Sequence, residues 1–153
     1  MVNFTVIDIE TNDLKSPSKV HCIVLRNSTG FKVIDNFYPK ELEYLNEIFR
    51  TVPIVGHNAI EYDFPILASL LNVYCPKRFF DTLVLSRLFR QGLINEGGHS
   101  LEAWGTRLDI PKLGGDIEDY SRYTPELKNR CIRDTKITYR LFEVLKERLG
   151  IVV

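Results

Sequence analysis

Residues 124–149 have the pattern of one long amphipathic helix whose apolar stripe contains a carboxylate. The stripe repeats at alternating spacings of four and three residues, as one face of an α-helix does; its members are Leu127, Cys131, Asp134, Thr138, Leu141 and Leu145. Thr124 is a favourable N-cap, and Pro125 suits the first helical position. An unpaired aspartate is costly to bury. The helix therefore predicts either a buried salt bridge between Asp134 and an arginine or a metal site.

The rest of the chain predicts an α/β fold, with a mixed five-stranded sheet and helices packed on it. Apolar runs at 4–9, 20–25 and 31–34 are joined by short connections, which is typical of an antiparallel meander. Strands at 54–56 and 78–80 then alternate with helices that begin near residues 41, 64, 83 and 101. Loops are expected at 91–98 and 112–116. Because no repeat or linker divides its 153 residues, we expect 1–153 to form a single domain.

Composition excludes some classes of function. Lysine plus arginine balance aspartate plus glutamate at 20 each, which counts against a protein that coats DNA by charge alone. No apolar run is long enough to cross a membrane and no signal peptide is evident, so no membrane partner is expected. The three cysteines, Cys22, Cys75 and Cys131, lack CxxC spacing. They predict buried, reduced thiols in a cytoplasmic protein.

Three more carboxylates lie on a strand or shortly after one. Asp8 and Glu10 are two residues apart along a strand, so both side chains point to the same face. Adjacent carboxylates repel unless a cation lies between them, although a solvated face would also explain this pair. Asp63 follows the strand at 54–56, where a loop turns into a helix. It is also consistent with an acid that stabilises a helix N-terminus.

The chemistry that these residues can support is narrow. Four carboxylates from separate segments suit hard cations such as Mg²⁺ or Mn²⁺. The sequence contains no histidine–cysteine cluster for zinc, no glycine-rich nucleotide-binding motif and no serine or cysteine nucleophile motif. A phosphodiester hydrolase with two metal ions is the enzyme that acids alone can build.

Five segments resemble, in order, the DEDD (DnaQ-like) superfamily of 3′→5′ exonucleases. Segments 4–14, 57–67 and 123–134 look like its three exonuclease motifs. Segments 81–88 and 99–108 are similar to the proofreading domain of family-A DNA polymerases from short-tailed phages. The resemblance spans nearly the whole chain and implies a ribonuclease-H-like (exonuclease) fold. Within the last two segments we expect structural roles for Asp81 as a helix cap, His99 as a loop anchor and Trp104 as a core aromatic.

The resemblance also implies roles for individual residues. Two divalent cations, Mg²⁺ or Mn²⁺, about 3.5–4 Å apart, would clamp the scissile phosphate; the acids that match their ligands are Asp8, Glu10, Asp63 and Asp134. The expected reaction releases nucleoside 5′-monophosphates from the 3′ end of single-stranded DNA, without reading its sequence. Leu14 matches a residue that wedges against the terminal base. The other positions matched to substrate binding are Thr11, His57, Asn58 and Tyr62.

Position 130 departs from the family pattern. The tyrosine subclass carries tyrosine four residues before the last acid, where this chain has Arg130, and the histidine subclass uses the position of Asn129. Arginine stays protonated and cannot be a general base. It can hydrogen-bond the scissile phosphate, or it can pair with an acid and quiet the site. We count Arg130 among the candidate catalytic residues and expect a working nuclease that is slower than its tyrosine-bearing relatives.

The leading hypothesis is therefore an exonuclease that trims single-stranded DNA. It would act free-standing, as a proofreading subunit with a DNA polymerase partner, or as a piece of a larger polymerase, in the host cytoplasm if phage-encoded. An exoribonuclease is the nearest alternative. A pseudo-nuclease, in which Arg130 ties up the acids and the fold binds 3′ ends or a partner protein, is a different class. An interaction domain without a nucleic-acid role leaves Asp134 unexplained.

Overall fold

The computed structural model describes residues 3–115 and 117–153. They form a five-stranded sheet in the order β3-β2-β1-β4-β5. The strands are β1 (Thr5–Thr11), β2 (Val20–Asn27), β3 (Gly30–Ile34), β4 (Ile54–Gly56) and β5 (Phe79–Asp81). The helices are α1 (Pro39–Thr51), α2 (Asp63–Leu71), α3 (Thr82–Phe89), α4 (Leu101–Arg107) and α5 (Pro125–Leu149), with a 3₁₀ helix, η1, at Gln91–Glu96.

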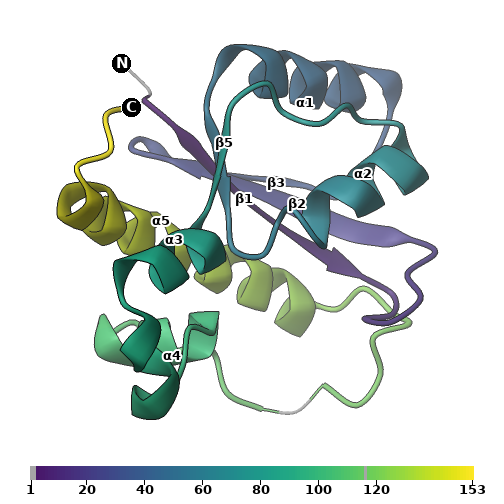
Figure 1. Cartoon of the computed structure of the whole chain (residues 1–153). Helices are drawn as coiled ribbons and strands as arrows, with labels where there is room; N and C mark the ends of the chain where they lie inside the picture. The colour runs from purple at the N-terminus through teal and green to yellow at the C-terminus, as the bar shows by residue number, and fades with distance from the viewer. Residues whose placement is uncertain (1–2, 116) are drawn as a thin grey trace.

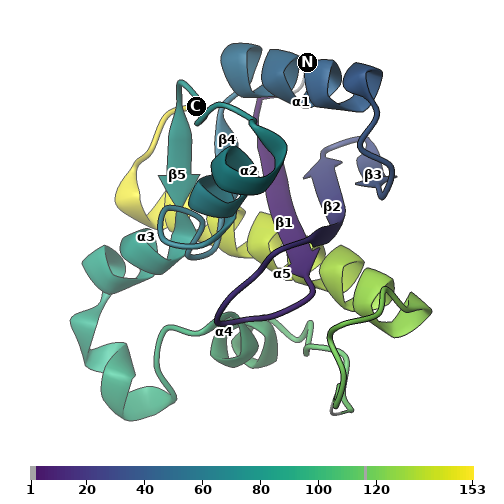
Figure 2. The same cartoon turned by 90° about the vertical axis from the view of Figure 1, so that its right-hand side faces the viewer.

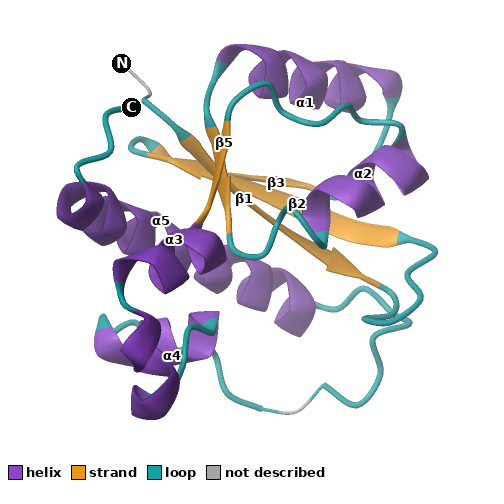
Figure 3. Cartoon of the chain, in the orientation of Figure 1, coloured by secondary structure: helices purple, strands orange, loops and turns teal. Residues whose placement is uncertain are grey.

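Helices cover both faces of this sheet (Figures 1 and 3). α1 and α2 lie on one face, and α5 crosses the other with α3 and α4 beside it. β1 pairs antiparallel with β2 and parallel with β4, while β5 is parallel to β4. The view in Figure 2 places β1 between β2 and β4, with α5 behind it. The predicted α/β fold with a mixed five-stranded sheet is confirmed.

β1 is central and continues beyond its parallel neighbour. Its register with β4 pairs Thr5 with Ile54 and Val6 with Val55, whereas its ladder with β2 extends from Val6 to Thr11. The second half of β1 therefore has a ladder on one side only. β1, β4 and β5 are parallel, so their carboxyl ends share one edge of the sheet, where open α/β sheets bind ligands.

Side chains of β1 alternate between two cores. Ile7 and Ile9 pack with α1 and α2 in the larger apolar cluster, together with Phe49 and Leu67. The other face of β1 carries Val6, which packs against α5, and then the two acids. The period of two in a strand thus places Asp8 and Glu10 beneath α5. The alternation that builds the core also positions the carboxylates.

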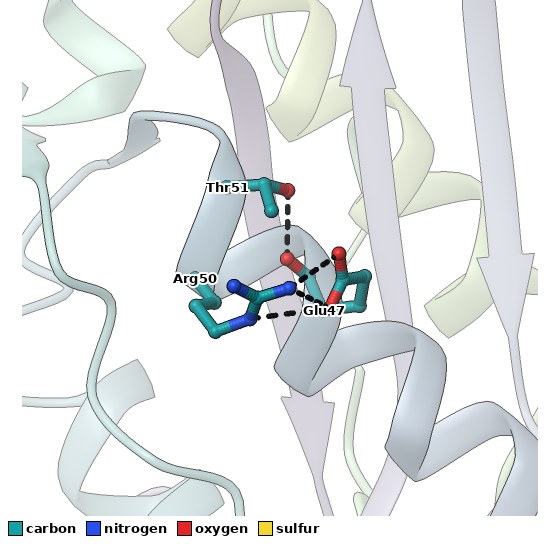
Figure 4. Close-up of polar contacts among 3 residues, drawn as sticks. All are labelled: Glu47, Arg50 and Thr51. Atoms are coloured by element: carbon teal, nitrogen blue, oxygen red, sulfur yellow. Dashed lines mark hydrogen bonds and ion pairs between the residues drawn. The ribbon is translucent and has the colours of Figure 1, made fainter.

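Local polar contacts join residues in the last turns of α1 (Figure 4). The Thr51 hydroxyl donates to the Glu47 carbonyl oxygen at 2.7 Å, and the Arg50 guanidinium donates to both Glu47 carboxylate oxygens at 2.7 and 2.8 Å. Both partners of the ion pair are more than half exposed, so it contributes at most about 1 kcal/mol. α1 ends at Thr51, because Val52 takes the extended conformation favoured before Pro53, from which the chain enters β4.

Three expectations need correction or qualification. The predicted loop at 91–98 contains η1, because Leu93 is buried against α4 and α5 and the Arg107 guanidinium donates to the Glu96 and Gly98 carbonyls. Cys75 is exposed rather than buried; all three cysteines are free. The end of the expected loop 112–116 lies outside the described residues. Among the described residues, no helix has the length and apolar character needed to cross a membrane.

Candidate active site

β1 and α5 bring three of the four predicted acids together. Asp8 and Glu10 face α5, and their carboxylate oxygens lie within 4.8 Å of each other and of the Cys131 sulfur. The Cys131 thiol donates to the Asp8 backbone carbonyl at 3.3 Å. Asp134 lies one turn further along α5. The remaining members of its stripe are buried, as predicted: Leu127, Cys131, Thr138, Leu141 and Leu145.

Asp134 pairs with a lysine rather than with the arginine considered as an alternative to a metal. The Lys112 ammonium donates to Asp134 Oδ2 at 3.1 Å, and the aspartate side chain is only 14% exposed. α5 itself is held against β2 by Arg26, which donates to the Thr135 hydroxyl and the Ile132 carbonyl. Lys112 comes from the connection between α4 and α5, and no sequence pattern pointed to it.

Asp63 comes from the side of β1 away from α5. It lies at the end of the turn that follows β4. It is the first residue of α2 and is 3% exposed. Asp81 holds the turn before it: its carboxylate accepts hydrogen bonds from the Asn58 and Ile60 amides at 2.9 and 3.1 Å. It also accepts one from the Leu83 amide at 3.0 Å, which confirms the predicted cap of α3. Asp81 therefore fixes the path of the chain toward Asp63.

A glycine makes this turn tight. A Cβ atom built on Gly56 would lie 2.5 Å from the Ala59 Cβ, so no larger residue fits without moving the turn. Asn58 adopts a left-handed backbone with φ of 60°, which asparagine tolerates better than most residues. The turn from Gly56 to Asp63 thus depends on two residues suited to its geometry and on the Asp81 carboxylate.

The acids line one pocket of about 290 Å³. Nine of the ten predicted site residues line it: Asp8, Glu10, Leu14, His57, Asn58, Tyr62, Asp63, Arg130 and Asp134. The tenth, Thr11, is buried beside it and contacts the Tyr62 hydroxyl at 2.8 Å. Sequence reasoning missed three lining residues, Ile9, Lys112 and Tyr120. The Tyr120 carbonyl accepts a hydrogen bond from His21 Nε2 at 2.7 Å, which ties its loop to β2.

Burial and mutual repulsion make these carboxylates hard to ionise. Burial raises the pKa of Asp8 well above its usual value, and the nearby Asp134, Asp63 and Glu10 raise it further. Burial and Asp134 raise the pKa of Glu10 to about 7, although Lys112 and Arg130 oppose the shift. Burial likewise raises the pKa of Asp63. A bound cation would reverse these shifts, because it stabilises the ionised form.

The donor set fits hard divalent cations. Four carboxylates converge from β1, the start of α2 and α5, and oxygen ligands of this kind suit Mg²⁺ or Mn²⁺. These acids are desolvated and repel one another, so a bound dication would stabilise their ionised forms. Asp8, Glu10, Asp63 and Asp134 are therefore the residues that would hold it.

His57 is neutral at physiological pH. Burial lowers its pKa to about 4, even though the Asp81 charge opposes the shift. Its Nδ1 lies 2.8 Å from the Thr82 hydroxyl, and that hydroxyl donates to the Gly56 carbonyl. His57 thus links the turn after β4 to the start of α3 and presents an uncharged ring to the pocket.

Arg130 lies at the pocket without neutralising an acid. Burial raises the pKa of Asp134, and the charges of Lys112 and Arg130 oppose the shift there as they do at Glu10, which places Arg130 within electrostatic reach of both acids. Within residues 3–115 and 117–153, however, it makes no ion pair shorter than 4 Å. Among the described residues, its guanidinium thus lies beside the acids without an ion-pair partner.

The chain is similar to part of a phage polymerase. The DNA-directed DNA polymerase of Escherichia phage T7 is 34% identical over an alignment of 149 positions, covering 79% of this chain. The chain spans only 21% of the length of that polymerase. No protein-family model matches the chain.

Two solved structures show the same fold. Brucella melitensis NrnC, solved bound to pGG, matches with a TM-score of 0.75 at 20% identity. The match covers 97% of this chain and 74% of the NrnC chain. NrnC has also been solved with bound Mg²⁺, with a TM-score of 0.74. Escherichia coli RNase D, an exoribonuclease, matches with a TM-score of 0.78 at 14% identity. The match covers 97% of this chain and 40% of the RNase D chain.

The sequence likeness is to a phage DNA polymerase, and the fold is shared with NrnC and with the exoribonuclease RNase D. The four acids of the predicted exonuclease motifs line a single pocket at the carboxyl ends of parallel strands. The chain is therefore similar in sequence to part of a phage DNA polymerase, and it shares the ribonuclease-H-like fold of NrnC and RNase D.

Proposed function

We propose that the chain is a divalent-metal-dependent 3′→5′ exonuclease that hydrolyses single-stranded DNA to nucleoside 5′-monophosphates. The observation that carries this proposal is the convergence of Asp8, Glu10, Asp63 and Asp134 on one pocket. Two cations, Mg²⁺ or Mn²⁺, would supply activation of the attacking water and stabilisation of the departing 3′ oxygen. We further propose that 1–153 act as one exonuclease unit.

The residues around the acids suit the end of a strand. Leu14 is 58% exposed at the pocket, where an apolar side chain can wedge against the terminal base. Asn58 and Tyr62 line the side that α2 contributes, and Thr11 supports the Tyr62 hydroxyl from β1. His57, being neutral, adds no charge that would compete with the cations. These contacts are to a sugar, a base face and a phosphate, so they favour no particular base sequence.

Arg130 has a substrate role in this proposal. A guanidinium that pairs with none of the described acids can donate to a phosphate oxygen. This availability argues against a pseudo-nuclease in which Arg130 ties up the acids. It does not supply the water-orienting phenol of the tyrosine subclass, so hydrolysis should be slower than in tyrosine-bearing relatives.

The comparisons offer support for DNA and for RNA as the substrate. The sequence likeness to a DNA polymerase favours DNA and a proofreading role, with a polymerase as covalent neighbour or partner. The fold shared with RNase D, an exoribonuclease, supports the alternative that the chain trims RNA. We favour DNA because the likeness to a DNA polymerase is in sequence, at 34% identity, whereas the likeness to RNase D is in fold at only 14% identity.

Cleavage of labelled oligonucleotides tests the proposal directly. A 5′-labelled single-stranded DNA is incubated with the protein and Mg²⁺ or Mn²⁺, beside an RNA of equal sequence and a chelator control. We expect a metal-dependent ladder that shortens from the 3′ end of the DNA. Faster shortening of the RNA would establish the exoribonuclease instead. Binding of either strand without cleavage in both metals would show a 3′-end binder, and the proposed activity would be wrong.

A further inference from the structure

Lys112 is the one lysine among the residues that line the acid pocket. Its ammonium lies 3.1 Å from Asp134 Oδ2. Its charge also stabilises the ionised form of Glu10. The Lys112 side chain is 39% exposed, whereas that of Asp134 is 14% exposed. The pair therefore joins a partly solvated ammonium to a largely buried carboxylate.

The backbone that carries Lys112 is anchored, so its approach to Asp134 does not depend on a flexible surface loop. The Arg133 guanidinium donates from Nε to the Pro111 carbonyl at 2.8 Å, next to both members of the pair. The Ile110 amide donates to the Gly105 carbonyl at 2.8 Å. A Cβ on Gly105 would lie 2.7 Å from the Ile110 carbonyl oxygen, so the loop passes as close to α4 as a glycine allows.

A divalent cation on Asp134 would encounter this ammonium. An oxygen lone pair directed at Lys112 is not free for a metal, and a dication within a few ångströms of an ammonium is repelled by it. Two dications would balance the four carboxylates by themselves, and the lysine would then add surplus positive charge. Since part of its side chain is already in solvent, it can turn outward without disturbing the core.

We propose that Lys112 competes with the divalent cation for Asp134 and so sets the metal concentration at which the site fills. The proposal rests on the metal site of the proposed function but concerns its regulation. The ammonium neutralises Asp134 at low metal concentration and yields the carboxylate at high concentration. Lys112 is in this sense a built-in competitor of the metal, distinct from Arg130, which pairs with no acid in the part of the chain described.

The test is Mn²⁺ binding to the full chain without nucleic acid, measured by titration calorimetry. Lys112→Met removes the charge and keeps most of the stem, and Lys112→Gln is a second neutral variant. Lys112→Arg keeps the charge. Lys40→Met is the matched control, because Lys40 is 82% exposed on α1, on the opposite face of the sheet. Thermal melting of each variant without metal checks that it is folded.

Both neutral variants should bind Mn²⁺ about three- to tenfold more tightly than the parent, as expected for loss of one partly exposed like charge. Lys112→Arg and Lys40→Met should match the parent within about twofold. Unchanged or weaker Mn²⁺ binding by both neutral variants would overturn the proposal, as would a parent chain that binds no Mn²⁺.

Because the Mn²⁺ titration contains no nucleic acid, its outcome does not depend on whether the chain cleaves DNA or RNA. A chain whose Mn²⁺ affinity depends on Lys112, but which cleaves neither strand, would support the competition and reject the nuclease. A chain that cleaves DNA, with neutral variants that do not bind Mn²⁺ more tightly, would do the opposite.

Discussion

The Tyr62 hydroxyl donates a hydrogen bond to the Thr11 hydroxyl at 2.8 Å and so joins the start of α2 to the end of β1. The direction follows from Thr11, whose own proton goes to the Asp13 carbonyl at 2.9 Å. A hydroxyl has one proton to donate, so Tyr62 must supply the other. The bond closes one side of the acid pocket and holds the Tyr62 ring in place.

Tyr62→Phe should weaken substrate binding more than turnover. The lost hydrogen bond lies within the protein and holds the ring that lines the pocket, so part of its roughly 1 kcal/mol should appear as weaker substrate binding. We expect KM for a short oligonucleotide to rise by up to about fivefold with kcat within twofold. Tyr74→Phe is the control, because Tyr74 is 74% exposed and lies outside the pocket. Steady-state kinetics with both variants decides this, and an unchanged KM for Tyr62→Phe would contradict the role given to Tyr62.

Asp134→Asn should abolish metal-dependent cleavage without loss of the fold. The amide keeps the shape of the side chain but binds hard cations poorly, so we expect activity to fall by about a hundredfold or more. Glu147→Gln, an exposed change on the same helix, should have no effect. Rates are measured beside circular dichroism. Normal turnover by Asp134→Asn would show that the metal site is elsewhere.

Glu10 should make stability fall as pH rises. Its pKa is about 7 in the folded chain, against 4.5 as the usual value. Between these two pH values the folded state binds more protons than the unfolded state, so raising the pH destabilises the fold. With a chelator present, Glu10→Gln should raise the free energy of unfolding by about 1–3 kcal/mol at pH 8 and have little effect at pH 4.

Denaturant unfolding at the two pH values measures this difference. Saturating Mn²⁺ should reverse it, because the metal stabilises the ionised Glu10 and has less to bind in the variant. If Glu10→Gln shifted stability equally at both pH values, a packing effect would explain the change and repulsion among the acids would not.

Arg130→Tyr should separate the two contributions of this position. The phenol restores the group that the tyrosine subclass uses, so kcat should rise by about tenfold or more. The guanidinium contact with phosphate is lost, so KM should rise as well. Single-turnover and steady-state rates report the two effects. A sharp fall in kcat would instead give arginine an active part in the chemical step.

Asp81→Ala should damage the site from a distance. Its carboxylate satisfies three amides, two of them in the turn that leads to Asp63. Leaving these partly buried amides without their acceptor should cost about 2–4 kcal/mol of folding free energy and lower kcat/KM. Ser100→Ala removes another helix cap, on α4, and should cost about 1 kcal/mol with activity retained. Equal effects of the two changes would argue against a special role for Asp81.

Periodic patterns made much of this fold predictable. The alternation in β1 and the four–three spacing in α5 come directly from backbone geometry, and they place Asp8 and Glu10 on one face of the strand and Asp134 on the core-facing stripe of the helix. The resemblance to the exonuclease motifs was needed to predict that these acids meet. The N-cap at Thr124 and the cap at Asp81 depend only on neighbouring residues, and both are present. Such local signals do not depend on tertiary contacts, so they can be read from the sequence.

Lys112 and η1 were not predictable for the opposite reason. A lysine in an irregular segment carries no periodic signal, and its approach to Asp134 depends on Gly105, Arg133 and the path of the loop between α4 and α5. η1 is stabilised by contacts of Leu93 and Arg107 with other elements. The exposure of Cys75 likewise depends on how the segment after α2 lies on α1. These features arise only from tertiary contacts.

The placement of Asp134 within the apolar stripe of α5 also limits which insertions the chain can tolerate. Adding or removing one residue inside this helix between Cys131 and Leu141 would rotate one part of the stripe by about 100° relative to the other. Either the carboxylate or the leucines would then face solvent. The irregular connection before α5 has no such phase to keep. Changes of length should therefore be tolerated in that connection, provided that Lys112 and the anchored Ile110, Pro111 and Tyr120 are spared, and rejected within the helix.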